Sequence, residues 1–300
     1  MNDRLLGLLP GGLWLAVVLA GCGSELTEPV ARLTLSPAEI DLGYPGSTSL
    51  SAEWQMTAPL AGEAASVGGD GPRVFVHLLD RSGEVVRTFD HELPFPWRPG
   101  EVRSSAVDVW QSALAPPVPP GDYDLTLGLY DLREGRRWAL ETDAPEVGRG
   151  EYRVARVRAL APSSGVEVAF GGSWEPTAEG SDRQVLARRW LVQAGTIELS
   201  GLPEAARVEL GLRLPEAAEG ERLVIREGLD GAWVRVSSPC AGGEVLVEGP
   251  GYGTVELELR DGEDGGCTLR IEPSFVVLDL DSLARRSVAL ERLTWSLGGA

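Results

Sequence analysis

The chain of 300 residues lacks lysine altogether and has only two histidines, two methionines and three cysteines. Without lysine, neither a Ser-x-x-Lys nucleophile nor a Walker phosphate loop can be built. The two histidines, His77 and His91, do not have the His-x-x-x-His spacing of a zinc enzyme. A Gly-x-Ser-x-Gly elbow and a dinucleotide-binding fingerprint are also missing. We therefore predict a protein that is not an enzyme, with His77 as a hydrogen-bonded sheet residue and His91 as a solvated one.

Positive charge is scarce as well. The 27 basic residues are all arginine and face 45 acidic residues, which gives a net charge of −18. An acidic surface repels phosphate backbones, so nucleic acid is excluded as a partner. The plain interpretation of this charge is solubility. Glycosidase activity is the one catalytic function that this composition does not exclude, because a glycosidase needs only two carboxylates about 5 to 9 Å apart.

The N-terminus carries an apolar segment from Leu5 to Ala20, which Pro10 and two glycines interrupt. It is too short for a membrane span of about 20 apolar residues and is typical of a signal peptide. The segment ends in Leu19-Ala20-Gly21-Cys22, which resembles the bacterial lipobox. The resemblance implies cleavage before Cys22 and acylation of this cysteine. The alternative is an ordinary signal peptide with an incidental cysteine.

The lipobox interpretation predicts a signal peptide over residues 1–21 and a lipidated tether over residues 22–30. The tether is small and polar and reaches roughly 25 Å when extended. The membrane is then a partner through the N-terminal lipid, since more than one acyl chain makes release slow. Cys22 is followed by Gly23 and Ser24, without the aspartate of the retention signal in many Gram-negative lipoproteins. That resemblance favours the outer membrane in a cell that has one.

Residues 31–160 show period-two alternation of apolar and polar side chains, the pattern of half-buried strands. Turn residues such as Pro119-Pro120-Gly121 separate seven or eight such runs, and no segment has helical periodicity. The sequence therefore predicts a β-sandwich. Its clearest apolar rows are Leu50, Ala52, Trp54 and Met56, and Tyr123, Leu125, Leu127 and Leu129.

Residues 161–300 repeat this style in nine or ten runs, which predicts a second β-sandwich of the jelly-roll type. The boundary is expected near residues 161–165. Near the C-terminus, Val288 and Leu290 occupy one phase of the alternation, whereas Leu293 and Trp295 occupy the other. One extra residue resets the phase of a strand, so we predict a β-bulge around Glu291 and Arg292. The predicted fold is thus all-β, with two sandwiches after a cleaved signal peptide.

Two cysteines, Cys240 and Cys267, remain once Cys22 is lipidated. In an oxidising compartment such a pair is most simply a disulfide, and each lies beside turn residues. Two free thiols are the alternative.

Two further features carry binding hypotheses. Trp97 and Trp174 lie in segments with loop composition, where an indole can stack on a sugar ring or else cap a sandwich core. The acidic segment around Asp261 and Asp264 offers oxygen ligands for calcium, with Asp279 and Asp281 further along the chain. The alternative is a solvated hairpin turn, and no other cofactor is indicated.

The first half resembles an immunoglobulin-like module found in the extracytoplasmic tails of bacterial membrane glycosyltransferases and related envelope proteins. The resemblance rests on Val74 to Asp80, Trp97 to Val102, Pro119 to Leu125 and Gly128 to Asp131. The second half is similar, more loosely, to a β-sandwich that accompanies this module, through Trp174-Glu175-Pro176, Arg189-Trp190 and Arg285 to Val288. The resemblance implies fold more than function, because the membrane-spanning enzyme is not part of this chain.

Three functions follow as hypotheses. The first is a non-catalytic envelope lipoprotein that contacts a surface glycan or a protein of the glycan-assembly machinery. The second is a structural or protein-interaction lipoprotein. The third is a glycan hydrolase that uses an unrecognised carboxylate pair.

Overall fold

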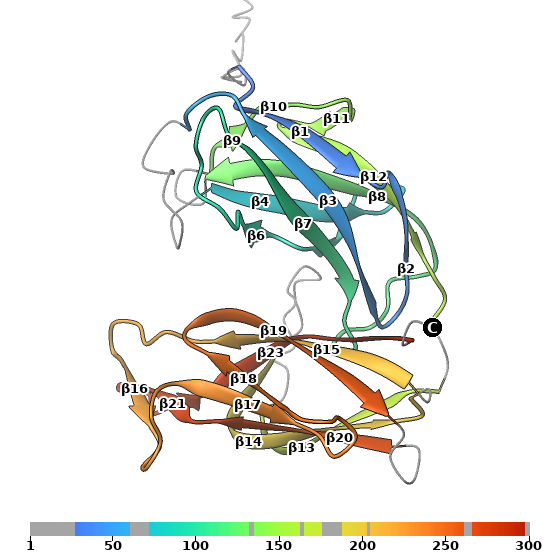
Figure 1. The fold of residues 1–300 in the computed structure, drawn as a ribbon. Coiled ribbons are helices and arrows are strands. Elements are labelled where there is room, and N and C mark those ends of the chain that lie inside the picture. Colours follow the sequence, from blue (N-terminus) through green and yellow to red (C-terminus); the bar gives the residue numbers. More distant parts are fainter. Residues whose placement is uncertain are drawn as a thin grey trace, which may run out of the picture.

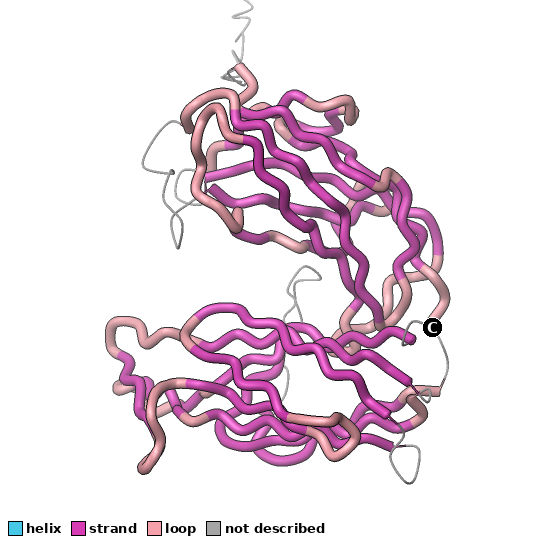
Figure 2. Tube along the Cα trace, in the orientation of Figure 1, coloured by secondary structure: helices cyan, strands magenta, loops and turns pink. Residues whose placement is uncertain are grey.

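The computed structural model describes residues 28–60, 72–131, 135–162, 165–175, 188–202, 205–260 and 266–297. Within these ranges every regular element is a β-strand (Figures 1 and 2). The predicted all-β class is therefore confirmed. Nothing helical in these ranges is long and apolar enough to cross a membrane.

The first unit, residues 28–162, contains two sheets. One has the order β10–β1–β3–β7, formed by Leu140–Glu141, Ala31–Ser36, Gly46–Met56 and Val102–Gln111. The other has the order β11–β12–β8–β4–β5, formed by Glu146–Gly148, Glu151–Ala159, Gly121–Asp131, Pro72–Leu79 and Val85–Thr88. Three short strands complete it: β2 (Glu39–Leu42) runs parallel to β12, β6 (His91–Glu92) pairs with β4, and β9 (Arg137–Trp138) pairs with β8.

The core of the first unit follows from the alternation along the strands. On β3 the predicted apolar row is buried and its polar neighbours are exposed. On β8 the predicted row is buried too, from Tyr123 to Leu129. The fully buried Trp54 donates its indole N–H to Ser105 Oγ at 3.1 Å, so its one polar atom is satisfied.

The second unit, residues 165–297, is built around one long antiparallel sheet in the order β18–β17–β20–β14–β23–β15–β19. These strands are Glu244–Glu248, Trp233–Ser237, Gly266–Pro273, Arg189–Ser200, Val288–Leu297, Ala205–Leu214 and Gly251–Arg260. A further strand, β13 (Glu167–Trp174), pairs with β14. A separate three-stranded sheet has the order β16–β21–β22, formed by Glu221–Ile225, Phe275–Asp279 and Arg285–Arg286.

The long sheet curls until it is nearly closed, instead of forming the two separate sheets that we predicted. The cause is β14, whose first residues, Arg189–Leu191, pair with β23, whereas Gly195–Ser200 pair with β20. One bent strand thus belongs to both layers, as at the corners of orthogonal β packings. The two end strands of this order, β18 and β19, lie close together. Gly253 of β19 lies so near Val247 of β18 that an added Cβ would be 2.6 Å from the valine side chain.

The predicted bulge near the C-terminus is confirmed. Gly211 of β15 pairs with Arg292, but the next residue, Leu212, pairs with Leu290. Glu291 is therefore the extra residue, and it reverses the facing of β23 so that Leu290 and Leu293 are both fully buried.

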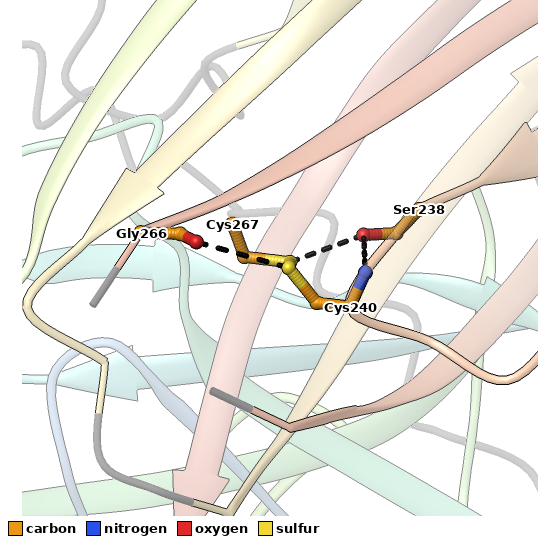
Figure 3. Close-up of a disulfide and its surroundings, with 4 residues drawn as sticks. All are labelled: Ser238, Cys240, Gly266 and Cys267. Atoms are coloured by element: carbon orange, nitrogen blue, oxygen red, sulfur yellow. Dashed lines mark hydrogen bonds between the residues drawn. A yellow bond between two sulfur atoms is a disulfide. The ribbon is translucent and has the colours of Figure 1, made fainter. Parts of the chain in front are cut away.

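The predicted disulfide is also confirmed. Cys240 lies in the turn after β17 and Cys267 lies on β20, with their Cα atoms 6.0 Å apart (Figure 3). Ser238 Oγ accepts a hydrogen bond from the backbone N–H of Cys240 and lies 3.0 Å from Cys267 Sγ. The bridge closes a loop that contains β18 and β19, the two strands at which the curled sheet meets itself.

The two units have separate hydrophobic cores, one from Val30 to Ala159 and the other from Leu191 to Leu293. We predicted the boundary near residues 161–165, of which residues 163 and 164 lie outside the described residues. The units touch where the end of β7 meets β23. There the Ala113 N–H donates to the Leu293 carbonyl at 2.8 Å, and the Leu293 N–H donates to Ser112 Oγ at 3.1 Å.

Candidate functional site

A groove of about 820 Å³ lies on the outer face of the first unit. Strands β2, β12 and β8 and the turn between β4 and β5 form it. Apart from the apolar floor, its lining is entirely charged, and we call it the charged groove. The lining residues are Glu39, Ile40, Asp41, Asp80, Arg81, Asp122, Tyr123, Asp124, Arg153, Arg156, Val157 and Arg158.

Strand alternation separates the walls of the groove from its floor. On β2, Ile40 is buried between the exposed Glu39 and Asp41, and on β12, Val157 is buried between Arg156 and Arg158. The same holds on β8, where Tyr123 is buried. Its hydroxyl donates to the Pro119 carbonyl at 2.7 Å, and burial is the main cause that raises its pKa. The charged side chains therefore stand on a fixed apolar layer.

A second β-bulge adds Arg153 to this face. Strict alternation would place residues 154, 156 and 158 together, but the register between β12 and β8 shifts between Arg153 and Ala155. Val154 and Ala155 are consequently both buried, and Arg153 lies on the same face as Arg156. Regular alternation along β12 does not predict this site. The consecutive apolar pair Val154-Ala155 inside an alternating run is the signal that could have shown it.

Three ion pairs cross the charged groove. Arg158 donates from Nε to Asp41 Oδ1 at 2.8 Å and from Nη2 to Asp41 Oδ2 at 2.6 Å, and this hydrogen bonding lowers the pKa of Asp41. Arg81 reaches Asp122 at 3.0 Å and Arg153 reaches Asp124 at 3.2 Å. All six side chains are more than a third exposed, so the pairs contribute little to stability.

Asp80 forms no ion pair in the described part of the chain but accepts hydrogen bonds from Ser82 and Glu84. Two other charged groups of the groove, Arg156 and Glu39, have neither an ion pair nor a side-chain hydrogen bond within the described residues. They are neighbours in the register between β12 and β2, and both are exposed. A guanidinium offers a planar set of donors, and a carboxylate offers only acceptors. The groove thus presents an uncommitted donor beside an uncommitted acceptor.

Two carboxylates of the groove, Asp41 and Asp80, are poor candidates for a general acid. That role requires a raised pKa, which burial in an apolar site supplies. Here hydrogen bonds from Arg158 lower the pKa of Asp41, and hydrogen bonds from Ser82 and its neighbours lower that of Asp80. Ionised carboxylates of this kind serve as hydrogen-bond acceptors for a ligand.

His77 lies on β4, which belongs to the same sheet as β8 and β12. Its Nδ1 is 3.3 Å from Glu151 Oε1, and the same oxygen accepts a hydrogen bond from Thr126 Oγ1 at 2.6 Å. This is the hydrogen-bonded sheet histidine that we predicted. His91, which we expected to be solvated, is only partly exposed, and its Nδ1 lies 3.0 Å from the Phe89 carbonyl.

The two tryptophans that we proposed as ligand contacts lie elsewhere. Trp97 is in a loop but is 4% exposed, and its indole N–H donates to the Ala58 carbonyl at 2.9 Å. Such a buried ring caps the core, as the alternative held, and has no free face for a sugar. Trp174 ends β13 instead of lying in a loop, donates to the Thr196 carbonyl at 3.0 Å and packs edge-on against Phe170.

The remaining predicted site residues, Cys22, Asp261 and Asp264, lie outside the described residues. Among the residues that are described, no cluster of three or more His, Cys, Asp or Glu side chains could hold a metal ion. The carboxylate of Asp279 accepts hydrogen bonds from the backbone N–H groups of Asp281 and Ser282, both at 2.9 Å. It therefore caps its own turn.

No model of a known protein family matches this chain, and no curated protein sequence matches it either.

Proposed function

We propose that this protein is a lipid-anchored, non-catalytic protein of the bacterial cell envelope that binds a surface glycan through the charged groove. The N-terminal lipobox motif supports the anchor, and the proposed site of acylation is Cys22. The groove is the observation that carries the binding role. Most small-molecule pockets are lined by apolar and aromatic side chains, whereas this one presents carboxylates and guanidinium groups in alternation.

A glycan suits such a lining because every sugar hydroxyl both donates and accepts hydrogen bonds. Guanidinium groups supply donors and carboxylates supply acceptors, and both occur along the whole groove. An apolar ligand would find its contact surface only on the floor. There Ile40, Tyr123 and Val157 are each less than a tenth exposed.

We also assign the first unit to the immunoglobulin-like class. Its first strand is split: β1 pairs antiparallel with β3 in one sheet, and β2 then crosses to pair in parallel with β12 in the other. The hydrogen bond from Tyr123 back to Pro119 has the form of the tyrosine corner of that class. This assignment agrees with the resemblance to the tails of envelope glycosyltransferases.

The binding role is tested with the full mature chain in which Cys22→Ser prevents acylation. Calorimetric titration with polysaccharides extracted from the producing envelope should show saturable binding. The double variant Arg156→Ala, Arg158→Ala should weaken it at least tenfold, because each lost charged hydrogen bond is worth about 1.5 to 3 kcal/mol. Arg222→Ala, an exposed arginine of the second unit, is the matched control. Equal affinities for all three proteins would refute the groove as the binding site.

The anchor is tested separately by mass spectrometry of the protein from its own membrane. We expect a chain that begins with an acylated Cys22, and we expect Cys22→Ser to remain uncleaved. An unmodified N-terminal methionine would exclude the lipoprotein assignment.

One observation favours a second function, contact with a partner protein. Strand β16 is the edge of its sheet, and its Leu223 and Val224 are 41% and 38% exposed. Exposed apolar edge strands are common sites of strand addition. Cross-linking in cells should recover one specific partner through residues of β16 if this function holds.

A further inference from the structure

The charges of the groove follow the strand order. The outer row of β12, Arg156 and Arg158, lies between two rows of carboxylates on the neighbouring strands. In register, Arg156 is flanked by Glu39 on β2 and Asp124 on β8. Arg158 is flanked in the same way by Asp41 and Asp122.

This arrangement is unfavourable for an anionic ligand. Five carboxylates and four guanidinium groups line the groove, so its own charge is slightly negative, and the chain around it carries −18. A chain of uronate or phosphate groups placed on the arginine row would lie between two rows of like charge. Like charges at such distances repel, and the acidic surface lowers the rate of encounter as well.

The pairing pattern identifies which groups contact the ligand first. Arg158 and Asp41 are held together by two short hydrogen bonds, which a ligand must break or share. Arg156 and Glu39 have no such bond within the described residues and are already adjacent. Two neighbouring hydroxyls of one sugar could bridge them, one accepting from the guanidinium and the other donating to the carboxylate.

We infer that the charged groove accepts an uncharged sugar polymer, with Arg156 and Glu39 as the residues that determine this specificity. The inference rests on the proposed glycan-binding function and adds the charge class of the ligand. An uncharged polyhydroxyl chain uses the donors and the acceptors together and introduces no charge of its own. Its binding should therefore depend little on salt.

Matched polymers test the inference most directly, with the full mature chain carrying Cys22→Ser. The probes are neutral glucan, mannan and galactan, each paired with the polyuronate of the same sugar, which differs by oxidation at one carbon. We expect at least one neutral polymer to bind with an affinity that changes less than about twofold between roughly 50 and 500 mM NaCl. Its uronate counterpart should bind at least about tenfold more weakly at the lower salt concentration.

Three variants link this selectivity to the named residues. Arg156→Gln and Glu39→Gln should each weaken binding of the neutral polymer about tenfold, while Arg222→Gln leaves it unchanged. Glu39→Arg should shift the preference towards the uronate, because it removes one negative charge and adds a positive one beside Arg156. Circular dichroism spectra equal to the wild-type spectrum show that the variants are folded.

The outcomes separate the inference from the proposed function. Tighter binding of a uronate, with an affinity that falls steeply with salt, overturns the charge class but leaves glycan binding in place. If a neutral polymer binds and neither Arg156→Gln nor Glu39→Gln weakens its binding, the assignment of these two residues is overturned. If no polymer of either kind binds, the glycan-binding function and the inference fail together.

Discussion

The missing side chain of Gly128 allows two neighbours to approach the middle of β8. A Cβ at this position would overlap the backbone oxygen of Gly150 and the ring of Phe75. That ring is 3% exposed and is covered by the guanidinium of Arg137, whose carbon lies 4.3 Å from the ring centre. The outer face of the sheet is therefore closed over Gly128.

We expect Gly128→Ala to lower the free energy of unfolding by about 1 to 3 kcal/mol, since the added methyl group must displace backbone as well as a packed ring. Gly243→Ala is the control, because a Cβ there has nothing within 4 Å. Urea unfolding of both variants measures the difference. Equal stability of the two would show that Phe75 moves aside without cost.

For individual residues, the sequence predicts which side chains are buried but not which groups they bind. The indole of Trp54 was predicted to lie in the core from alternation alone, and it does. Trp97 and Trp174 lie outside clear alternating runs, and their polar atoms bond to carbonyls 39 and 22 residues away. Such contacts depend on which distant segments the fold brings together, and local composition does not encode that.

At the scale of the elements, Glu151 connects three strands of one sheet. Its carboxylate, with a side chain 15% exposed, accepts hydrogen bonds from Thr126 on β8 and from Arg137 on β9, at 2.6 and 3.2 Å, and lies 3.3 Å from His77 on β4. Burial alone would raise its pKa, but the hydrogen bond from Thr126 and the charges of His77 and Arg137 outweigh burial and lower it.

Glu151→Gln should therefore destabilise the protein in a pH-dependent way. A lowered folded pKa stabilises the fold above the unfolded value of 4.5, and this contribution is lost as the pH falls through the folded pKa. We expect the variant to be about 1 to 2 kcal/mol less stable at about pH 7 and closer to the wild type at about pH 3. Urea unfolding at both pH values measures this, with the exposed Glu53→Gln as control. A difference that is the same at both pH values would contradict an ionised carboxylate as its source.

The disulfide acts on a different pair of elements. Cys240 and Cys267 are 27 positions apart and hold the turn after β17 against the start of β20. Replacing both with alanine should lower the free energy of unfolding by about 3.5 kcal/mol on the chain-entropy model. Thermal unfolding in the Cys22→Ser background measures the loss. A loss below about 1 kcal/mol would mean that the curled sheet closes without the bridge.

Some features of the strands could be predicted from the sequence and others could not. The alternation predicted the strands, and the change of phase predicted the bulge at Glu291, because both are local consequences of which face is buried. The bend of β14 was not predicted, since it arises from pairing with β23 at one end and β20 at the other. The charged groove was missed for the same reason: its rows come from β2, β8 and β12, whose register the sequence does not show.

At the scale of the whole molecule, Arg292 connects the two units. It belongs to β23 of the second unit, its side chain is 4% exposed, and it pairs with Glu209 of β15 in its own unit. It also reaches Asp108 on β7 of the first unit at 3.8 Å, and its guanidinium carbon lies 4.9 Å from the ring centre of Trp110. The bulge at Glu291 sets the facing of this arginine, so a local irregularity of one strand positions the contact between the units.

We expect Arg292→Met to weaken the contact between the units while leaving each core intact. Glu209, whose side chain is 18% exposed, would lose its closest cation, and both the ion pair to Asp108 and the stacking on Trp110 would be lost. Differential scanning calorimetry should then resolve two unfolding transitions in place of one, and small-angle X-ray scattering should show a larger radius of gyration. Arg207→Met is the matched control, because Arg207 lies in the same junction but its ion pairs among the described residues are with Glu256 and Glu258 of its own unit. An unchanged radius together with a single transition in Arg292→Met would mean that the other hydrogen bonds of the junction hold the units together without this arginine. These bonds join Ala113 and Ser112 to Leu293, and Ser47 to Glu209.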